Sequence, residues 1–196
     1  MFNDLSSPLS LLTTRRSGKP RDLSAPGPDA AQLRKALEIA IRTPDHGKIG
    51  PWRFVIVEQD QRDAFARLLE QALFAQNPDA GEKEAQAARE FAMQAPCLVV
   101  LLSRPDSTRP IPLWEQQLSA GAAAMNLLHA VHAMGFAGGW LTGWPAYNDQ
   151  VRDAFGTAED RIAGFLFIGT PARELQERPR PAYDDVVSVW KAPNRA

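Results

Sequence analysis

The segment SAGAAAMNLLHAVHAMG at residues 119–135 decides the fold that we expect for this chain. It is rich in alanine and almost free of charge, and it belongs to a helical pattern that begins at Trp114 and ends at about Met134. A helix that is apolar around most of its circumference is stable only when other elements cover it on several sides. We therefore expect most of its circumference to be buried, with the rest of the chain built around it.

Amphipathic helices and short apolar strands alternate in the part of the chain before the central helix. Asp29 can cap the first helix, whose apolar residues recur at spacings of three and four. This helix must end near Pro44, because proline disfavours helical geometry in the residue before it. We predict this helix, a second from about Gln61 and a third at 83–94, with strands at 53–58 and 97–103.

The part of the chain after the central helix contains further strand signals. We expect a short strand and turn in FAGGWLTGWP (136–145), a helix from Asn148 to Gly156, a strand at 162–171 and a last strand-like run at 185–190. The alternation of strands and helices would suit a parallel α/β sheet. Because strands are few and the last one follows an irregular arm, a mixed sheet completed by an exchanged arm is equally allowed.

Length and composition limit the classes of protein. A chain of 196 residues suits one domain, which we place at 1–196. Twenty-two Lys and Arg against 23 Asp and Glu give a net charge of −1, so nucleic acid is not an expected partner. No run of ~18 apolar residues predicts a membrane span, and no export signal is apparent. Cys97, the only cysteine, lies in an apolar run and is expected to be a buried small hydrophobe, and this usage suits the cytoplasm.

Two arginine clusters far apart in the sequence are candidates for anion binding. RRS at 15–17 combines guanidinium forks with a hydroxyl, and RPR at 178–180 supplies two more arginines in a proline-flanked context. Such groups hold a phosphate through several charge-assisted hydrogen bonds. The two clusters either converge on one phosphate or are unrelated surface charge.

Two further stretches have a functional and a structural interpretation. RTPDHGKIGPWRF at 42–54 is either a basic turn with one core tryptophan or a segment facing a ligand, and Lys48 is ambiguous between solvent and that ligand. The glycines of GFAGGWLTG at 135–143 allow either a flat ligand or a packed helix to approach the backbone. His129 and His132 are expected to pack inside the central helix. The sequence has no glycine-rich nucleotide loop, nucleophile elbow or metal-ligand spacing, so no metal is expected.

In their order along the chain, RRS, RTPDHGKIGPWRF, WEQQLSAGAAAMNLLHAVHAMGF, GGWLTG, GFLFIGTP and RPRP resemble the flavin (FMN)-dependent nitroreductase family, in particular its short bacterial NAD(P)H nitroreductases. The resemblance covers roughly residues 8–190. It implies an α+β, nitroreductase-like fold with a central, mostly antiparallel sheet flanked by helices. It also implies an intertwined homodimer with an exchanged C-terminal strand and two FMN sites at the subunit interface.

The resemblance implies roles for the residues of the arginine clusters. Arg15 and Ser17 match family positions on phosphate or ribityl oxygens, and Arg16 matches a position near the flavin pyrimidine edge. Arg180 corresponds to the later phosphate-binding arginine, with Arg178 as the second candidate.

Five more residues are implied to bind the cofactor. Arg42 and His46 resemble positions that reach the FMN bound mainly by the other subunit. Trp140, Leu141 and Thr142 stand in the turn that contacts the isoalloxazine. Relatives often carry a basic residue where this chain has Leu141, so a backbone contact is expected there.

The activity implied is that of an FMN-dependent oxidoreductase. It takes hydride from NAD(P)H and reduces nitroaromatics, quinones or a related small electron acceptor by a ping-pong mechanism. The flavin carries the chemistry, and we identify no catalytic side chain. The alternatives are other flavin reactions of the same fold, namely dehalogenation, ene reduction or consumption of the flavin, and a non-catalytic flavin-binding regulatory dimer.

Overall fold

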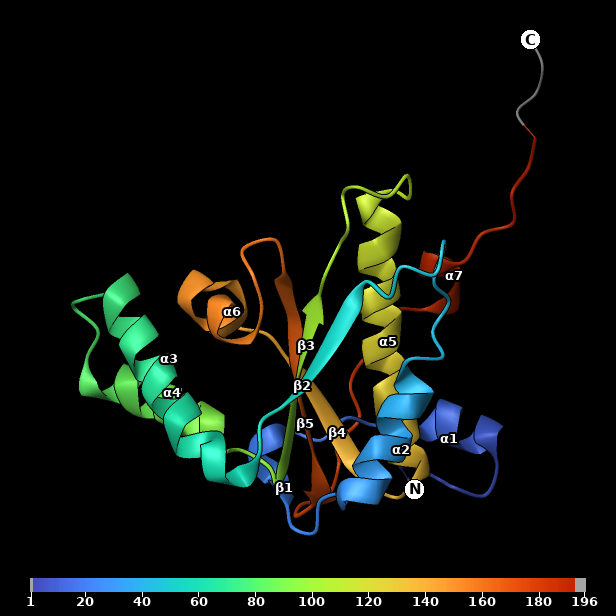
Figure 1. The fold of residues 1–196 in the computed structure, drawn as a ribbon. Coiled ribbons are helices and arrows are strands. Elements are labelled where there is room, and N and C mark those ends of the chain that lie inside the picture. The colour runs from blue at the N-terminus through green and yellow to red at the C-terminus, as the bar shows by residue number, and fades with distance from the viewer. Residues whose placement is uncertain (1, 193–196) are drawn as a thin grey trace.

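The computed structural model describes residues 2–192 of the chain, which form one five-stranded sheet between two layers of helices (Figure 1). Strand order is β1-β5-β3-β2, and β4 pairs with β5 beside β1. All four recorded pairings are antiparallel, which confirms the mostly antiparallel sheet. The strands are β1 Leu23–Ser24, β2 Trp52–Ile56, β3 Cys97–Ser103, β4 Ala137–Leu141 and β5 Arg161–Pro171.

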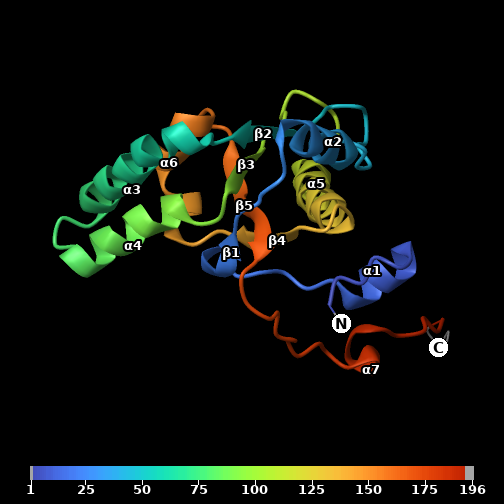
Figure 2. The same cartoon turned by 90° about the horizontal axis from the view of Figure 1, so that it is seen from below.

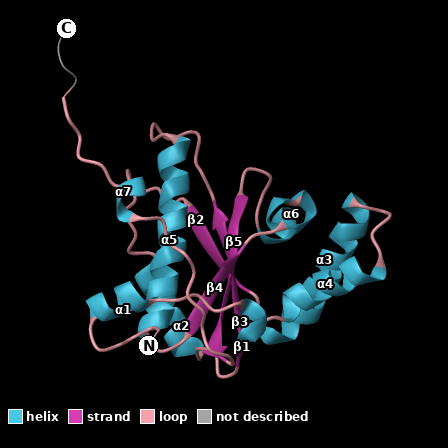
Figure 3. Ribbon diagram, turned by 180° about the vertical axis from the view of Figure 1, so that it is seen from behind, coloured by secondary structure: helices cyan, strands magenta, loops and turns pink. Residues whose placement is uncertain are grey.

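Helices cover both faces of the sheet, and Figures 2 and 3 show the same two layers from below and from behind. Helices α3, α4 and α6 lie on one face, while α2 and α5 lie on the other with α1 beside them. The helices are α1 Pro8–Thr14, α2 Ala30–Ala40, α3 Arg62–Gln76, α4 Glu82–Met93, α5 Leu113–Ala133, α6 Asp149–Phe155 and α7 Tyr183–Val186.

The central strand β3 contributes side chains to two hydrophobic cores, one on each face of the sheet. All seven of its residues are buried. Leu98 and Val100 pack in the core beneath α3 and α4, whereas Val99 and Leu101 pack in the core beneath α2 and α5. This is the period-two alternation of a strand that is covered on both faces.

Local capping explains where several helices begin. The Asp29 side chain accepts a hydrogen bond from Gln32 N at 2.8 Å, and Gln32 Oε1 accepts one from Asp29 N at 3.0 Å, so α2 starts at a reciprocal capping box. Asn148 Oδ1 accepts from Val151 N at 3.0 Å and caps α6 as predicted. Helix α1, which the sequence analysis did not predict, has its own cap at Ser7.

Helix α5 lies where the sequence places the central helix, but one of its faces is uncovered. Its inner side packs against α2 and the sheet. Trp114, Leu118 and Ala122 are spaced one turn apart and are exposed, with Trp114 67% accessible. The expected burial of most of the circumference is therefore incomplete in the described chain.

The strand predicted at 185–190 does not form in this structure. Asp185 and Val186 belong to the short helix α7, and residues 187–190 pair with no described strand. Figure 1 shows this arm leaving the body beside α5, away from the sheet, so its backbone has no partner with which to form a ladder. Residue 1 and residues 193–196 of the predicted domain lie outside the described residues.

One edge of the sheet is also left open. Strand β2 pairs with β3, and no other described strand borders it.

Among the described residues, no helix is long and apolar enough to span a bilayer.

Candidate functional site

The candidate site is built where the RRS segment crosses from α1 to the region of β4 and α5. Arg15 follows the last residue of α1, and its Nη1 donates to Ser17 Oγ at 3.3 Å. A cavity of about 250 Å³, with several apolar side chains in its wall, opens beside this segment. It is lined by Arg15, Ser17, Gly18, Lys19, Pro20, Met125, Leu128, Gly139, Trp140, Leu141 and Arg178.

A second, more polar cavity of about 520 Å³ adjoins the first. It lies between the RRS segment and the irregular arm that follows β5, at 173–178. The two cavities share Ser17, Gly18, Lys19 and Arg178, so they adjoin at these residues. The smaller cavity is the more apolar end, with Met125, Leu128 and Trp140 in its wall. The larger cavity is the polar end, and it is lined by cations and carboxylates together: Arg16, Lys19, Arg173 and Arg178 with Asp22, Glu174 and Glu177.

The two arginine clusters of the sequence lie near one another where the two cavities meet. Arg15 lines the smaller cavity, Arg16 the larger one, and Arg178 lines both, while Arg180 acts on the charges of Arg15 and Arg16. Burial, and after it the positive charges of Arg16 and Arg180, lower the pKa of Arg15. Burial also lowers the pKa of Arg16, with Glu177 opposing the shift and Arg180 and Arg178 adding to it. An anion close to these arginines, whether the Glu177 carboxylate or a ligand, relieves their mutual repulsion.

The side chain of Arg16 is bound to the arm. Its guanidinium, with the side chain 6% exposed, donates from Nε and Nη2 to the carbonyl oxygen of Gln176 at 2.8 and 2.6 Å. The Glu177 carboxylate lies 3.3 Å from Arg16 Nε. Arg16 therefore ties the N-terminal cluster to the segment that carries Arg178 and Arg180.

The backbone of Arg16 is held as firmly as its side chain. Its N–H donates to Asn3 Oδ1 at 2.8 Å, and its carbonyl oxygen lies 3.1 Å from His132 Nε2. The other ring nitrogen of His132, Nδ1, is 2.6 Å from the Leu128 carbonyl oxygen. Burial lowers the pKa of His132, although its hydrogen bonds to Leu128 and Arg16 oppose the shift.

His129, one turn before His132, faces the same cluster. Its Nδ1 is buried and has no hydrogen-bond partner among the described residues. Burial, and after it the charge of Arg15, lower its pKa.

The glycines of the GGW turn allow close packing against the RRS segment. A Cβ on Gly139 would lie 2.6 Å from the Gly18 carbonyl oxygen, and one on Gly138 would lie 2.6 Å from a Leu128 methyl carbon. Trp140 donates its indole N–H to the Ala163 carbonyl at 2.9 Å, which fixes the ring at the cavity wall.

Arg42 and His46 are not brought to this surface within one chain. His46 Nδ1 lies 2.7 Å from Glu115 Oε2 in the first turn of α5, whereas the cavity reaches α5 at Met125 and Leu128. At 1.5 Å per residue Glu115 and Met125 are roughly 15 Å apart along the helix. Thr142 follows β4 and lines neither cavity. The role of Arg42 and His46 at a second subunit's cofactor stays a prediction.

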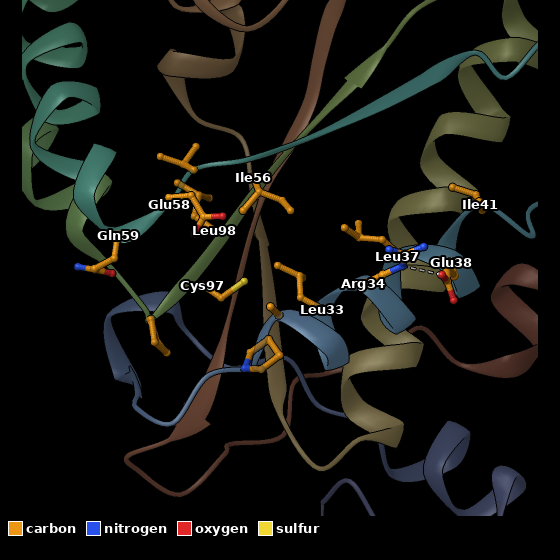
Figure 4. Close-up of a pocket in the computed structure, with 14 residues that line it drawn as sticks. Leu33, Arg34, Leu37, Glu38, Ile41, Ile56, Glu58, Gln59, Cys97 and Leu98 are labelled. Atoms are coloured by element: carbon orange, nitrogen blue, oxygen red, sulfur yellow. Dashed lines mark hydrogen bonds and ion pairs between the residues drawn. The ribbon is translucent and has the colours of Figure 1, made fainter.

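A separate cavity of about 510 Å³ lies beside the open edge of β2 (Figure 4). Its walls come from α2 and from the neighbouring ends of β2 and β3. They include Leu33, Leu37, Ile41, Ile56 and Cys97. Burial raises the pKa of the Cys97 thiol to about 11, which confirms the prediction of a buried small hydrophobe.

Sequence reasoning missed the residues that hold the arginine cluster together. Asn3, His132 and Gln176 bond to Arg16 across separations of 13, 116 and 160 residues. No local pattern reports such a pairing, and His132 was assigned to packing because it lies on an apolar helix.

Sequence comparison supplies the class of the protein. The model of the Nitroreductase family matches residues 12–170, and the chain belongs to this family. It is 38% identical over 164 residues to "Putative NAD(P)H nitroreductase YdjA" of Escherichia coli (strain K12), an alignment that covers 83% of this chain and 87% of the relative. A Haemophilus influenzae protein named "Putative NAD(P)H nitroreductase" is 37% identical over 88% of this chain and 92% of its own length.

Solved structures show the same fold at low sequence identity. A nitroreductase-like family protein from Bacillus cereus superposes with a TM-score of 0.80 at 19% identity, covering 95% of this chain and 97% of that one. The FMN and NADPH-dependent nitroreductase NfnB, as the Y88A mutant, gives a TM-score of 0.73 at 19% identity, covering 93% and 98%. These likenesses confirm the nitroreductase-like fold.

Proposed function

We propose that this protein is an FMN-dependent oxidoreductase that takes hydride from NAD(P)H and reduces a nitroaromatic, a quinone or a related small acceptor by a ping-pong mechanism. The observation that carries the proposal is the pair of adjoining cavities, one more apolar and one polar, with arginines of both sequence clusters where they meet. Its shape and polarity suit a ligand with a flat ring system at one end and a phosphate at the other. The names of the relatives, NAD(P)H nitroreductases, support the same assignment.

The residues around the junction of the two cavities fit the phosphate. Arg15, Arg178 and Arg180 supply cations that a phosphate neutralises, and Ser17 adds a hydroxyl. Arg16 is proposed to stand near the pyrimidine edge while its guanidinium holds the arm through Gln176.

The residues at the apolar end fit the ring system. Trp140, Leu141 and Met125 provide the wall against which the ring packs, and Thr142 continues the turn. Because Leu141 has no polar side-chain atom, the contact at that position is proposed to come from its backbone.

FMN supplies the redox chemistry when it is bound, and the protein residues bind it, orient it and exclude water. We assign no side chain as a general acid or base. Arg42 and His46 are proposed to serve the cofactor of the second subunit.

A homodimer with exchanged C-terminal segments is part of this proposal. Among residues 2–192, three surfaces lack a partner: the outer edge of β2 with the cavity beside it, the α5 stripe at Trp114 and Leu118, and the arm at 186–190. Trp190 is 80% exposed on that arm. We propose that residues 185–190 of a second copy pair with β2, with their apolar side chains in the adjacent cavity. A cytoplasmic location, which the single buried cysteine suits, is also proposed.

The test of the proposed activity is direct. The purified protein is examined for flavin absorbance, and oxidation of NADH and of NADPH is assayed with a nitroaromatic and with a quinone. We expect a yellow protein, parallel lines in double-reciprocal plots at varied acceptor concentrations, and loss of turnover when the flavin is removed. A colourless protein that FMN neither binds nor stabilises against heat would contradict the proposal.

A further inference from the structure

A carboxylate lies inside the arginine cluster. Glu177 Oε1 is 3.3 Å from Arg16 Nε and 3.6 Å from Arg180 Nη2, and it accepts a hydrogen bond from the backbone N–H of Arg178 at 2.8 Å. A single oxygen atom therefore faces three donors from the two ends of the chain. This is the environment that an anionic oxygen of a ligand would also seek.

We propose that Glu177 is a built-in competitor for the phosphate of the cofactor, because its carboxylate takes the anion position of the arginine cluster and must move away when the phosphate binds. The inference rests on the proposed function. It adds a determinant of cofactor affinity to the residues expected to contact FMN.

The balance of charge favours replacement of the carboxylate. Arg15, Arg178 and Arg180, the arginines proposed for the phosphate, bring three positive charges, and Glu177 brings one negative charge, while the Arg16 guanidinium is held by the Gln176 carbonyl. A phosphate monoester carries about two negative charges and three acceptor oxygens, so it satisfies more of these donors than one carboxylate does. A carboxylate left close to the bound phosphate would repel it.

The contacts also show which partner is free to move. The Glu177 side chain is 62% exposed on an arm without regular secondary structure, whereas that of Arg16 is 6% exposed. The Gln176 carbonyl holds Arg16 through two hydrogen bonds that do not involve the carboxylate. Removal of the Glu177 charge therefore leaves Arg16 in place, and the change acts on the anion site itself.

The experiment compares the Glu177→Gln variant with the natural protein in titrations of FMN and of riboflavin, which lacks the phosphate. For loss of one like charge at a partly exposed site we expect the Kd for FMN to fall about three- to tenfold, with the Kd for riboflavin unchanged. Glu82→Gln is the matched control, because Glu82 is an exposed carboxylate paired with Arg89 on α4. It should leave both affinities unchanged.

An unchanged or weaker affinity of Glu177→Gln for FMN would overturn the inference, and weaker binding would make Glu177 a positioning residue. Equal gains for FMN and riboflavin would overturn it as well, since the effect would not depend on the phosphate. If the natural protein binds neither flavin, the proposed function fails. The inference about Glu177 is then tested by comparing the thermal unfolding of the natural protein and of Glu177→Gln in inorganic phosphate. Greater stabilisation of Glu177→Gln by phosphate would then support it, and equal or smaller stabilisation would overturn it.

Discussion

His132 Nε2 lies 3.1 Å from the carbonyl oxygen of Arg16, so the last turn of α5 fixes the backbone between Arg15 and Ser17. The second ring nitrogen faces the Leu128 carbonyl at 2.6 Å. The backbone N–H of Gly138 also faces Nε2, at 3.4 Å, so His132 contacts the backbones of the RRS segment, α5 and β4. A neutral imidazole donates only one hydrogen bond, so it fully satisfies only one of the two oxygens. His132 is thus a positioning residue for the candidate site, although it lines neither of the site cavities.

Replacement of His132 by Leu should weaken FMN binding and lower the free energy of unfolding by about 1–3 kcal/mol, because a buried carbonyl loses its donor. Replacement by Gln, whose amide N–H can donate, should restore much of the FMN affinity. FMN titration and urea unfolding measure the two effects. Equal FMN affinities in the natural protein and both variants would refute the positioning role.

The stability of the protein should fall as the pH falls below about 6.5, the ordinary pKa of histidine. Burial lowers the folded-state pKa of His132, and burial and Arg15 lower that of His129. The unfolded chain therefore binds more protons in this range than the folded chain, so stability is present above this pH and is lost below it. The slope is at most about 1.4 kcal/mol per pH unit for each histidine. Urea unfolding between pH 7 and pH 5 measures the slope, and His132→Gln should flatten it; an unchanged slope would contradict the assignment.

Arg15→Ala and Arg180→Ala should each weaken FMN binding by about 10- to 150-fold, the loss of a charged hydrogen bond worth roughly 1.5–3 kcal/mol. Riboflavin should bind these variants nearly as well as it binds the natural protein, because the lost contact is to the phosphate. Arg67→Ala, at an exposed position of α3, is the control. Unaltered FMN affinity in both variants would mean that the phosphate is held elsewhere.

Gly139→Ala should displace the Gly18 segment, because the added methyl would lie 2.6 Å from the Gly18 carbonyl oxygen. We expect FMN binding to weaken at least about tenfold and the melting temperature to fall, as for other overpacked sites. At Gly81 the corresponding methyl would meet only Glu84 Oε2 at 3.7 Å, so Gly81→Ala is the matched control for FMN affinity. A Gly139→Ala protein with natural affinity and melting temperature would contradict this packing.

Changes in the C-terminal arm should alter the oligomeric state. Val189→Asp combined with Trp190→Ser should shift the protein from dimer towards monomer at micromolar concentration, because it places charge and polarity in a groove lined by Leu37 and Ile56. Light scattering after size-exclusion chromatography measures the mass. Tyr147→Ser, at another exposed aromatic residue, is the control. A double variant that stays fully dimeric would argue against the exchange.

Locally encoded features of the fold were predictable from the sequence. The strand Cys97–Ser103 was predicted at its observed boundaries because it is a continuous apolar run, and Asp29 and Asn148 were predicted as caps because their residue types satisfy free backbone N–H groups. The run at 185–190 has the composition of a strand, but a strand also needs a neighbour. That neighbour is absent from the described chain.

The candidate site was predictable only in part for the same reason. The residue types of Arg15 and Arg180 indicate an anion site. The structure brings these arginines close enough that the charge of Arg180 adds to the effect of burial in lowering the pKa of Arg15. The bonds of Arg16 to Gln176 and His132 arise from the tertiary fold, so no spacing in the sequence reports them.

The central claim is that this chain binds FMN and uses it to pass electrons from NAD(P)H to a small acceptor. It is tested most directly by mixing the FMN-loaded protein with NADH or NADPH under anaerobic conditions, following the visible absorbance of the flavin, and then adding a nitroaromatic or a quinone. We expect the absorbance to bleach on addition of the nicotinamide and to return on addition of the acceptor. Absorbance that stays unchanged with both nicotinamides would contradict the account.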